Sequence, residues 1–248
     1  MNRRNRHTAR KVIQTVLTVG LLLALLQLAT AADRASFDST NAPQDVALTT
    51  DPVNAFWKGA GVVFAEEGKD GESVGSYRTE IRSRWTENNL YFLFICPYET
   101  LYLKPEPRTA TETYQLWDWD VAEVFLGTDF KNIRKYKEFE ISPQAEWIDL
   151  DIDLDKPHHE DGWAWNSGFV VMARVDQDTK IWYGAMRIPF SALGIRKPHD
   201  GETLRINLFR SQGPPSHRVQ VAWRRTMRES FHVPERFGIL RLVATPTR

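Results

Sequence analysis

The sequence predicts an all-β domain, an antiparallel β-sandwich of the jelly-roll or immunoglobulin-like two-sheet type with one short helical turn. Three observations support this prediction. Short segments that alternate apolar and polar residues recur along most of the chain. Turn residues separate these segments at short intervals, and no segment keeps an amphipathic helical period over three turns. Many short strands joined by turns are typical of a sandwich or a barrel.

The first 31 residues predict a secretory signal peptide. Five basic residues and no acidic one precede an apolar stretch over 12–29, and Ala29–Ala31 supplies the small residues of a cleavage site. The apolar stretch approaches the roughly 20 residues of a spanning helix, so an uncleaved anchor is the alternative. We expect cleavage after Ala31 and export to the periplasm or the cell exterior.

The remaining chain predicts a flexible leader over 32–44, which is polar and contains Pro43, followed by one domain over 45–248. Cleavage would leave 27 basic and 32 acidic residues, because the five removed charges are all basic. A mildly acidic chain without a basic run is a poor ligand for nucleic acid or an anionic membrane. Cys96 is the only cysteine, so no internal disulfide forms and the core must stabilise the fold. We expect a monomer.

The expected strands follow the alternating segments in order. One of them, Leu90–Cys96, is a continuous apolar run, which indicates a strand buried on both faces. The helical turn is expected at 189–194, where Ser191 could cap a turn that Gly194 ends. The strands are expected at 78–85, 90–96, 121–126, 136–141, 147–154, 169–175, 181–188, 203–209, 219–223 and 239–243.

Glu123 and Arg210 are charged residues at positions that the alternation assigns to apolar faces. Glu123 shares a strand face with Val121 and Phe125, and Arg210 ends a face of apolar residues. A buried carboxylate needs a charged or hydrogen-bonding partner. Two interpretations stay open: a structural Glu–Arg pair, or a polar floor below a ligand pocket with Trp117 at its rim.

A second group of acidic residues lies on the segment 136–141, where Tyr136, Glu138 and Glu140 share one face. A solvated polar face is the simplest interpretation. The group becomes a candidate site if this strand lies beside the strand that carries Glu123.

A third group alternates Asp149, Asp151, Asp153 and Asp155 with apolar residues. Like charges on one face repel each other, and Ca²⁺ with its oxygen ligands would relieve that repulsion. The spacing matches no EF-hand loop, so these carboxylates are weak calcium candidates. We expect the chain to require no cofactor. His158–Asp161 is expected to be a polar loop rather than a metal site.

The order of the segments resembles that of the family 9 carbohydrate-binding modules, and more closely that of family-9-like secreted proteins related to DOMON domains. The resemblance spans roughly residues 46–243 and rests on six weak motifs in one order. These motifs are Leu90–Phe92, Trp117–Phe125, Tyr136–Pro143, Trp182–Pro189, Arg205–Asn207 with Arg210, and Phe231–Gly238.

The resemblance implies a β-sandwich that grips the end of a sugar chain between two aromatic rings, with calcium supporting the fold in some members. Trp117 and Phe231 match the positions of the two rings, and Glu123 matches a carboxylate that accepts sugar hydroxyls. Phe231 departs from the Trp of the best-known sugar binders. Glu140 departs from an Arg, and Phe209 falls near a polar contact.

The leading expectation is non-catalytic binding of a poly- or oligosaccharide end in carbohydrate catabolism, with ligand contacts from Trp117, Glu123, Glu140, Arg210 and Phe231. A separate glycoside hydrolase acting in trans is the expected partner. Three alternatives stay open. One is a glycosidase or lyase in which Glu123 works with Glu140 or Asp120.

The second alternative is a DOMON-type haem protein, for which the axial-ligand candidates are Met172, Met186, Met227 and His232. The third is a structural or interaction domain.

Overall fold

The computed structural model describes residues 35–244, and the expected signal peptide lies outside the described residues. Thirteen strands occur in this range, and the helical segments are short 3₁₀ turns. None of these helical segments is long and apolar enough to cross a membrane. The all-β prediction is confirmed. The strands are β1 Ser36–Asn41, β2 Gly61–Ala65, β3 Glu67–Gly68, β4 Thr79–Trp85, β5 Asn89–Pro97, β6 Val121–Gly127, β7 Lys135–Ile141, β8 Trp147–Asp153, β9 Val170–Asp176, β10 Ile181–Pro189, β11 Thr203–Gln212, β12 Val219–Ala222 and β13 Gly238–Val243.

The 3₁₀ turns lie mainly in the connections between strands. The expected helical turn is present as η5, and Gly194 ends it with a φ of 72°. Ser191 does not cap this turn, because no side-chain hydrogen bond forms at its N-terminus. The turns are η1 Ala55–Trp57, η2 Gly75–Tyr77, η3 Leu116–Asp118, η4 His159–Ala164, η5 Phe190–Leu193, η6 Pro215–His217 and η7 Pro234–Arg236.

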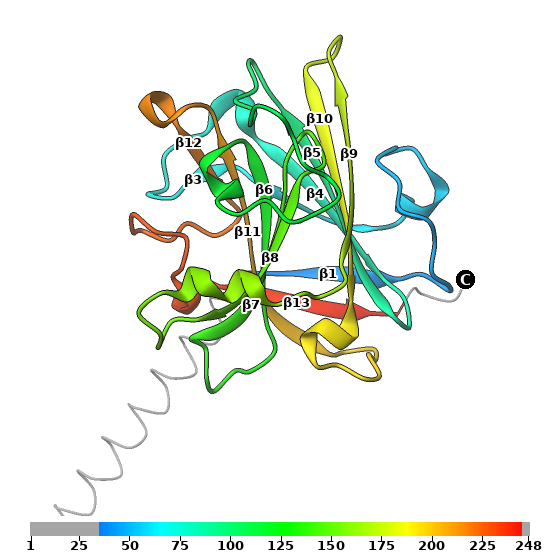
Figure 1. Ribbon diagram of the computed structural model, residues 1–248. Helices are drawn as coiled ribbons and strands as arrows, with labels where there is room; N and C mark the ends of the chain where they lie inside the picture. The colour runs from blue at the N-terminus through cyan, green and yellow to red at the C-terminus, as the bar shows by residue number, and fades with distance from the viewer. Residues whose placement is uncertain (1–34, 245–248) are drawn as a thin grey trace, which may run out of the picture. The chain divides into compact units, whose positions relative to one another are not determined.

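The strands form two layers that are joined through β1. The order is β8-β7-β6-β11-β13-β1-β4-β5-β10-β9, with β12 paired to β11 and β2 paired to β4. β1 runs parallel to β13 on one side and to β4 on the other, as Figure 1 shows for β1 and β13. The other pairs are antiparallel, including the long β5–β10 pair.

The strand β1 corrects the expectation of a flexible leader over 32–44. Ser36–Asn41 is rich in small polar residues, and it gave no strand signal that could compete with that interpretation. Pairing on both sides satisfies its backbone, while Phe37 and Ser39 point into buried positions. Tertiary pairing therefore outweighs the low β-propensity of this segment.

The main core lies between the two layers. Phe139 and Leu208 from one layer belong to the same apolar cluster as Phe92 and Trp182 from the other. The layers approach closely at Gly184 on β10. A Cβ atom there would lie 3.1 Å from Cγ2 of Ile141 on β7 and 2.8 Å from a ring atom of Trp182. This position therefore needs a residue without a side chain.

Part of the outer face of each layer is also buried. On β5, Tyr91 and Leu93 pack beneath Leu48 and Trp57, so the predicted burial of this strand on both faces is confirmed. On the other layer, a second apolar cluster covers the outer face of β6, β7, β8 and β11. Its members from the connections include Leu116 of η3 and Phe231. The candidate site lies within this second covered face.

Candidate functional site

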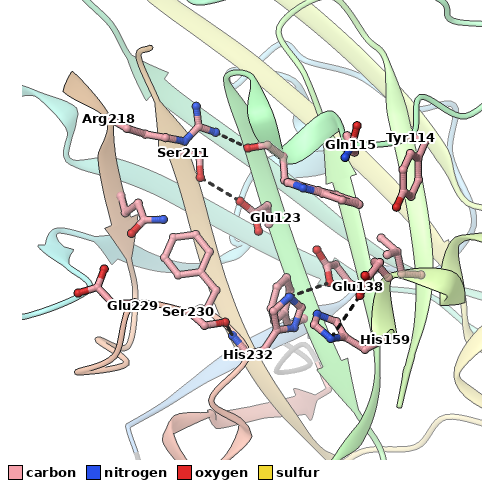
Figure 2. A pocket seen from close by; sticks show the side chains of 16 residues that line it. Tyr114, Gln115, Glu123, Glu138, His159, Ser211, Arg218, Glu229, Ser230 and His232 are labelled. Atoms are coloured by element: carbon pink, nitrogen blue, oxygen red, sulfur yellow. Dashed lines mark hydrogen bonds and ion pairs between the residues drawn. The ribbon is translucent and has the colours of Figure 1, made fainter. Parts of the chain in front are cut away.

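A pocket of about 410 Å³ opens on the outer face of β6, β7 and β8, beside β11 and β12. Its volume falls in the range of roughly 300–1,000 Å³ that is common for small-molecule sites. Figure 2 shows Glu123 and Glu138 on neighbouring strands, with His232 and His159 nearby. The lining residues are Tyr114, Gln115, Trp117, Glu123, Phe125, Glu138, Leu150, His159, Glu160, Ser211, Arg218, Gln220, Glu229, Ser230, Phe231 and His232.

Glu123 lies on the floor of this pocket. Strand alternation places it on the outer face of β6 with Val121 and Phe125, and it is almost fully buried. Its Oε1 accepts a hydrogen bond of 3.3 Å from the hydroxyl of Ser211 on β11. Burial, reinforced by the nearby Glu138 carboxylate, raises the pKa of Glu123 to about 8. The side chain can therefore act as a hydroxyl donor or as an acceptor near neutral pH.

Two further carboxylates from β7 lie beside Glu123. Tyr136, Glu138 and Glu140 share the outer face as predicted, but this face is buried rather than solvated. Glu140 is the register partner of Glu123, and one oxygen from each of the three glutamates lies within 4.8 Å of the others. Burial raises the pKa of Glu138 to about 7 and raises that of Glu140 well above its ordinary value.

Two aromatic residues line the pocket at positions that the sequence singled out. Trp117 belongs to η3, is half-buried and meets the ring of Tyr114 edge-on at 5.5 Å. Phe231 is 8% exposed and stacks on Phe209 of β11, with ring centroids 4.0 Å apart and planes inclined by 10°. Stacking on Phe209 holds the Phe231 ring in place at the pocket wall.

Arg218 supplies the cationic group of the pocket. Its guanidinium donates to the carbonyl oxygens of Trp117, Asp118 and Trp119, and to that of Gly213. These bonds satisfy carbonyl groups at the end of η3, which otherwise lack partners. Arg218 therefore fixes the backbone that carries the Trp117 ring.

His232 packs against the pocket floor as a neutral ring. Its Nδ1 lies 2.6 Å from the hydroxyl of Tyr136, and its ring stacks on Phe125 with a centroid separation of 5.3 Å. Burial lowers the pKa of His232 to about 3. Its Nε2 lies 4.0 Å from Oε2 of Glu138. His159 of η4 covers the same ring edge-on at 4.3 Å.

Arg210 corrects the sequence interpretation. In the β6–β11 register Glu123 is paired with Phe209, so Arg210 points to the opposite face of the layer. Arg210 is fully buried inside the sandwich, where it donates to Thr79 Oγ1 at 3.2 Å and to Gln212. The predicted pairing with Glu123 is wrong because both faces of this layer are buried. Apolar neighbours therefore could not reveal which face each residue occupies.

Asp120, the other carboxylate considered for catalysis, is committed to structural hydrogen bonds. It accepts from the amides of Tyr102 and Gly213 and from the side chain of Gln212, at 2.6–2.9 Å. It is not among the residues that line the pocket. Glu123 and Glu140 lie side by side on one floor, whereas glycoside hydrolysis needs carboxyl groups flanking the scissile bond.

The aspartates of β8 each have a partner. Asp149 is buried and accepts from the amide of Ser167 at 2.9 Å, while Asp151 and Asp153 form ion pairs with Lys137 and Lys135. Lysine partners relieve the mutual repulsion that suggested calcium. A calcium ion at these aspartates stays a prediction.

None of the three methionines considered as haem ligands lines the pocket. Met186 is buried in the main core, and Met172 and Met227 are exposed away from the lining residues. His232 does line the pocket, but its Nδ1 bonds to Tyr136, and its ring packs between Phe125 and His159. The described residues therefore do not fit an axial His–Met pair.

Several residues of the pocket were not identified from the sequence. Arg218, His159 and Gln220 come from separate connections and a short strand, and no local pattern brings them to Glu123. Ser211 was within reach of pattern analysis, since it follows Phe209 by two positions on the same strand face. The predicted strand ended at 209, three residues before β11 ends.

The fold and pocket together define a two-layer β-sandwich with a ligand-sized pocket on the outer face of one layer. The family model described as carbohydrate family 9 binding domain-like matches residues 51–245. The chain belongs to this family, as its sequence motifs suggested.

Comparisons with individual proteins agree with this assignment. The chain is 24% identical over 173 residues to an extracellular protein of Arthroderma benhamiae, which covers 64% of this chain and 76% of that protein.

Solved structures that share the fold include the two that follow. One is a family 9 carbohydrate-binding module from Caldicellulosiruptor kristjanssonii in complex with glucose. It has a TM-score of 0.60 and 13% identity, and the match covers 85% of this chain and 98% of that one. The other is a protein of Bacteroides uniformis that carries the provisional description of a carbohydrate-binding protein. It has a TM-score of 0.64 and 14% identity, with 85% and 100% coverage.

Proposed function

We propose that the chain is a non-catalytic carbohydrate-binding protein that holds the end of a poly- or oligosaccharide in the pocket. A sugar ring lies between Trp117 and Phe231, and Glu123 bonds to its hydroxyl groups. Glu140 lies beside Glu123 on the neighbouring strand. Arg218 keeps Trp117 in position. Arg218, and not Arg210, is therefore the cationic side chain that serves this pocket.

The observation that carries this proposal is the combination of two aromatic rings, half-buried Trp117 and buried Phe231, with buried carboxyl groups in one pocket. Sugars present C–H faces that pack on aromatic rings and hydroxyl groups that need polar partners. Trp117 and Phe231 offer the first kind of surface, and Glu123 and Ser211 offer the second. Family membership and the sugar complex of a structural relative support the same function.

We also propose that the protein is exported and contributes to carbohydrate catabolism, with a hydrolase acting in trans. The signal-like segment 1–31 and the extracellular relative support export. Intact-mass measurement of protein recovered outside the cytoplasm tests the cleavage site. A mass that matches a chain beginning at Ala32 supports cleavage. The mass of the full-length chain, found in the membrane fraction, supports an anchor.

The binding proposal is tested by a glycan array and pull-down on insoluble polysaccharides with the purified protein. Trp117→Ala and Glu123→Gln are compared with Phe130→Ala, because Phe130 is 45% exposed and lies outside the pocket lining. By analogy with stacking on nucleobases, loss of a stacked ring costs about 1–3 kcal/mol, which is roughly a tenfold loss of affinity or more. Binding by the wild type and Phe130→Ala alone supports the proposal. Failure of the folded wild type to bind any glycan contradicts it.

A further inference from the structure

Glu140 is a buried carboxyl group whose side-chain hydrogen bond, to Glu138, requires a proton shared between the two acids; when both are ionised it has no donor among the described residues. Its relative exposure is 0%, and apart from that shared proton neither Oε1 nor Oε2 has a hydrogen-bond partner. Its neighbours at the pocket floor are the carboxylates of Glu123 and Glu138, and Oε2 of Glu138 likewise has no other hydrogen bond. An unpaired buried carboxylate is costly, so an ion or a proton must occupy the space between these groups.

No lysine or arginine of the described residues forms an ion pair with Glu140; the charge of Arg218 acts on it only from a longer distance. Arg218 is the nearest candidate, but its guanidinium is directed to four backbone carbonyl groups. Lys137 follows Tyr136 on the opposite face of β7, where it pairs with Asp151 at 2.6 Å. His232 is neutral in its buried position.

The spacing of the three carboxylates suits a divalent cation. One oxygen from each lies within 4.8 Å of the other two. Calcium–oxygen bonds of 2.3–2.6 Å place ligands on opposite sides of the ion about 4.6–5.2 Å apart. A central ion therefore needs only small side-chain movements to contact all three. Glu123 and Glu138 line the pocket, which gives the ion a route to this position.

We propose that Glu123, Glu138 and Glu140 bind a calcium ion at the floor of the pocket. The three oxygen ligands come from two neighbouring strands, which hold them rigidly. Calcium takes six to eight oxygen ligands, so positions remain free on the pocket side. If the pocket binds sugar as proposed above, hydroxyl groups of the sugar occupy these free positions. This last step alone rests on the proposed function.

The all-oxygen ligand set favours calcium over zinc. Zinc commonly binds nitrogen and sulfur ligands in tetrahedral sites. The nearest nitrogen is Nε2 of His232, which lies 4.0 Å from Oε2 of Glu138 and outside the compact carboxylate group. The β8 aspartates are a separate location, already paired with lysines, and they serve as an internal control.

The cation site is tested without sugar, by calorimetric titration of the chelator-treated full chain with CaCl₂ and, separately, ZnCl₂. Glu140→Gln keeps the shape of the side chain and removes one charged ligand, and Asp151→Asn is the matched control. We expect one Ca²⁺ per chain, at least tenfold weaker binding in Glu140→Gln and unchanged binding in Asp151→Asn. The melting temperature should rise with Ca²⁺ in the wild type and not in Glu140→Gln.

Four results would overturn the calcium site. These are no calcium binding at millimolar concentration, equal binding by Glu140→Gln, loss in Asp151→Asn instead, or tighter zinc binding that His232→Asn abolishes. The sugar step has a separate test, in which affinity for a glycan is compared in Ca²⁺ and in chelator. If the chelator leaves the sugar affinity unchanged, the sugar hydroxyl groups do not bind the ion. That result would not contradict the ion site itself.

Discussion

Glu123 on β6 and Glu140 on β7 are register partners that face each other with no cationic side chain between them. Most buried carboxylates in proteins have a charged or hydrogen-bonding partner. Ser211 bonds to Glu123, whereas the hydrogen bond between Glu140 and Glu138 requires a proton shared between two acids. The sandwich thus places three acidic groups together at the floor of its pocket, where ionising all of them is costly. That cost should be visible in the stability of the protein.

The stability of the ion-free protein should fall as pH rises from about 6.5 to 8. The pKa values of Glu123 and Glu138 are raised to about 8 and about 7, so the folded chain holds protons that the unfolded chain releases. Stability from a raised carboxyl pKa is fully present below the ordinary pKa of 4.5 and is lost as pH rises to about 8, so this window covers the upper part of the loss. His232, with its pKa lowered to about 3, destabilises the fold only below about pH 6.5.

Urea denaturation in chelator across pH 6.5–8 measures this slope. Glu140→Gln should flatten it, because one member of the interacting group is removed. Addition of Ca²⁺ should also flatten it, since the ion replaces protons at the carboxylates. A slope that is equally steep in Glu140→Gln would show that other groups control the pH dependence.

Arg210→Met should destabilise the protein without weakening sugar binding. The change removes the hydrogen bonds to Thr79 and Gln212 inside the sandwich and leaves buried acceptors unsatisfied, which costs about 1–3 kcal/mol. Glu123→Gln should have the opposite profile, with weaker sugar binding and equal or greater stability. Denaturant unfolding and calorimetry on the folded variants separate the two effects. Equal losses of affinity in both variants would contradict the assigned faces.

Arg218→Met should loosen η3 and weaken sugar binding. The carbonyl groups of Trp117 and Trp119 lose charged donors, each worth about 1.5–3 kcal/mol, while the apolar stem is kept. Hydrogen exchange at 116–120 should accelerate, and sugar affinity should fall about tenfold. Arg225→Met is the control, because Arg225 is exposed and its ion-pair partner is Glu67 at 3.6 Å. Equal exchange rates in the two variants would contradict this role.

Phe231→Leu should separate ring stacking from apolar burial. Leucine fills part of the space over Phe209 but cannot stack on it, so a modest loss of stability is expected. The loss of a ring face should weaken sugar binding by roughly tenfold, by analogy with base stacking. Thermal unfolding and sugar titration measure the two effects. Wild-type affinity in a folded Phe231→Leu protein would exclude Phe231 from the ligand contacts.

The sequence predicted the strands well where alternation was strong. The ten expected strands are present, and alternation correctly grouped Glu123 with Phe125 and Glu140 with Glu138, but it did not predict that both groups share one buried outer face. Ser36–Asn41 was missed because it becomes a strand through neighbours more than 40 residues away. Gly61–Ala65 and Glu67–Gly68 were also missed, because these segments are short and contain glycine.

The candidate site was only partly predictable. Trp117, Glu123 and Phe231 line one pocket, although they lie on three separate segments. The error at Arg210 has a physical cause, since loops cover the outer face of its layer and make both faces apolar. Arg218 and His232 reach the pocket through connections whose paths depend on tertiary packing. Their contribution could not follow from strand alternation.

The most direct test of the account is a crystal structure of the protein with the tightest-binding glycan from the array. We predict a sugar ring packed on Trp117 and close to Phe231, with a hydroxyl group within hydrogen-bond distance of Glu123 or of an ion that Glu123 holds. A sugar bound elsewhere on the protein, with the pocket filled only by solvent, would contradict the central claim.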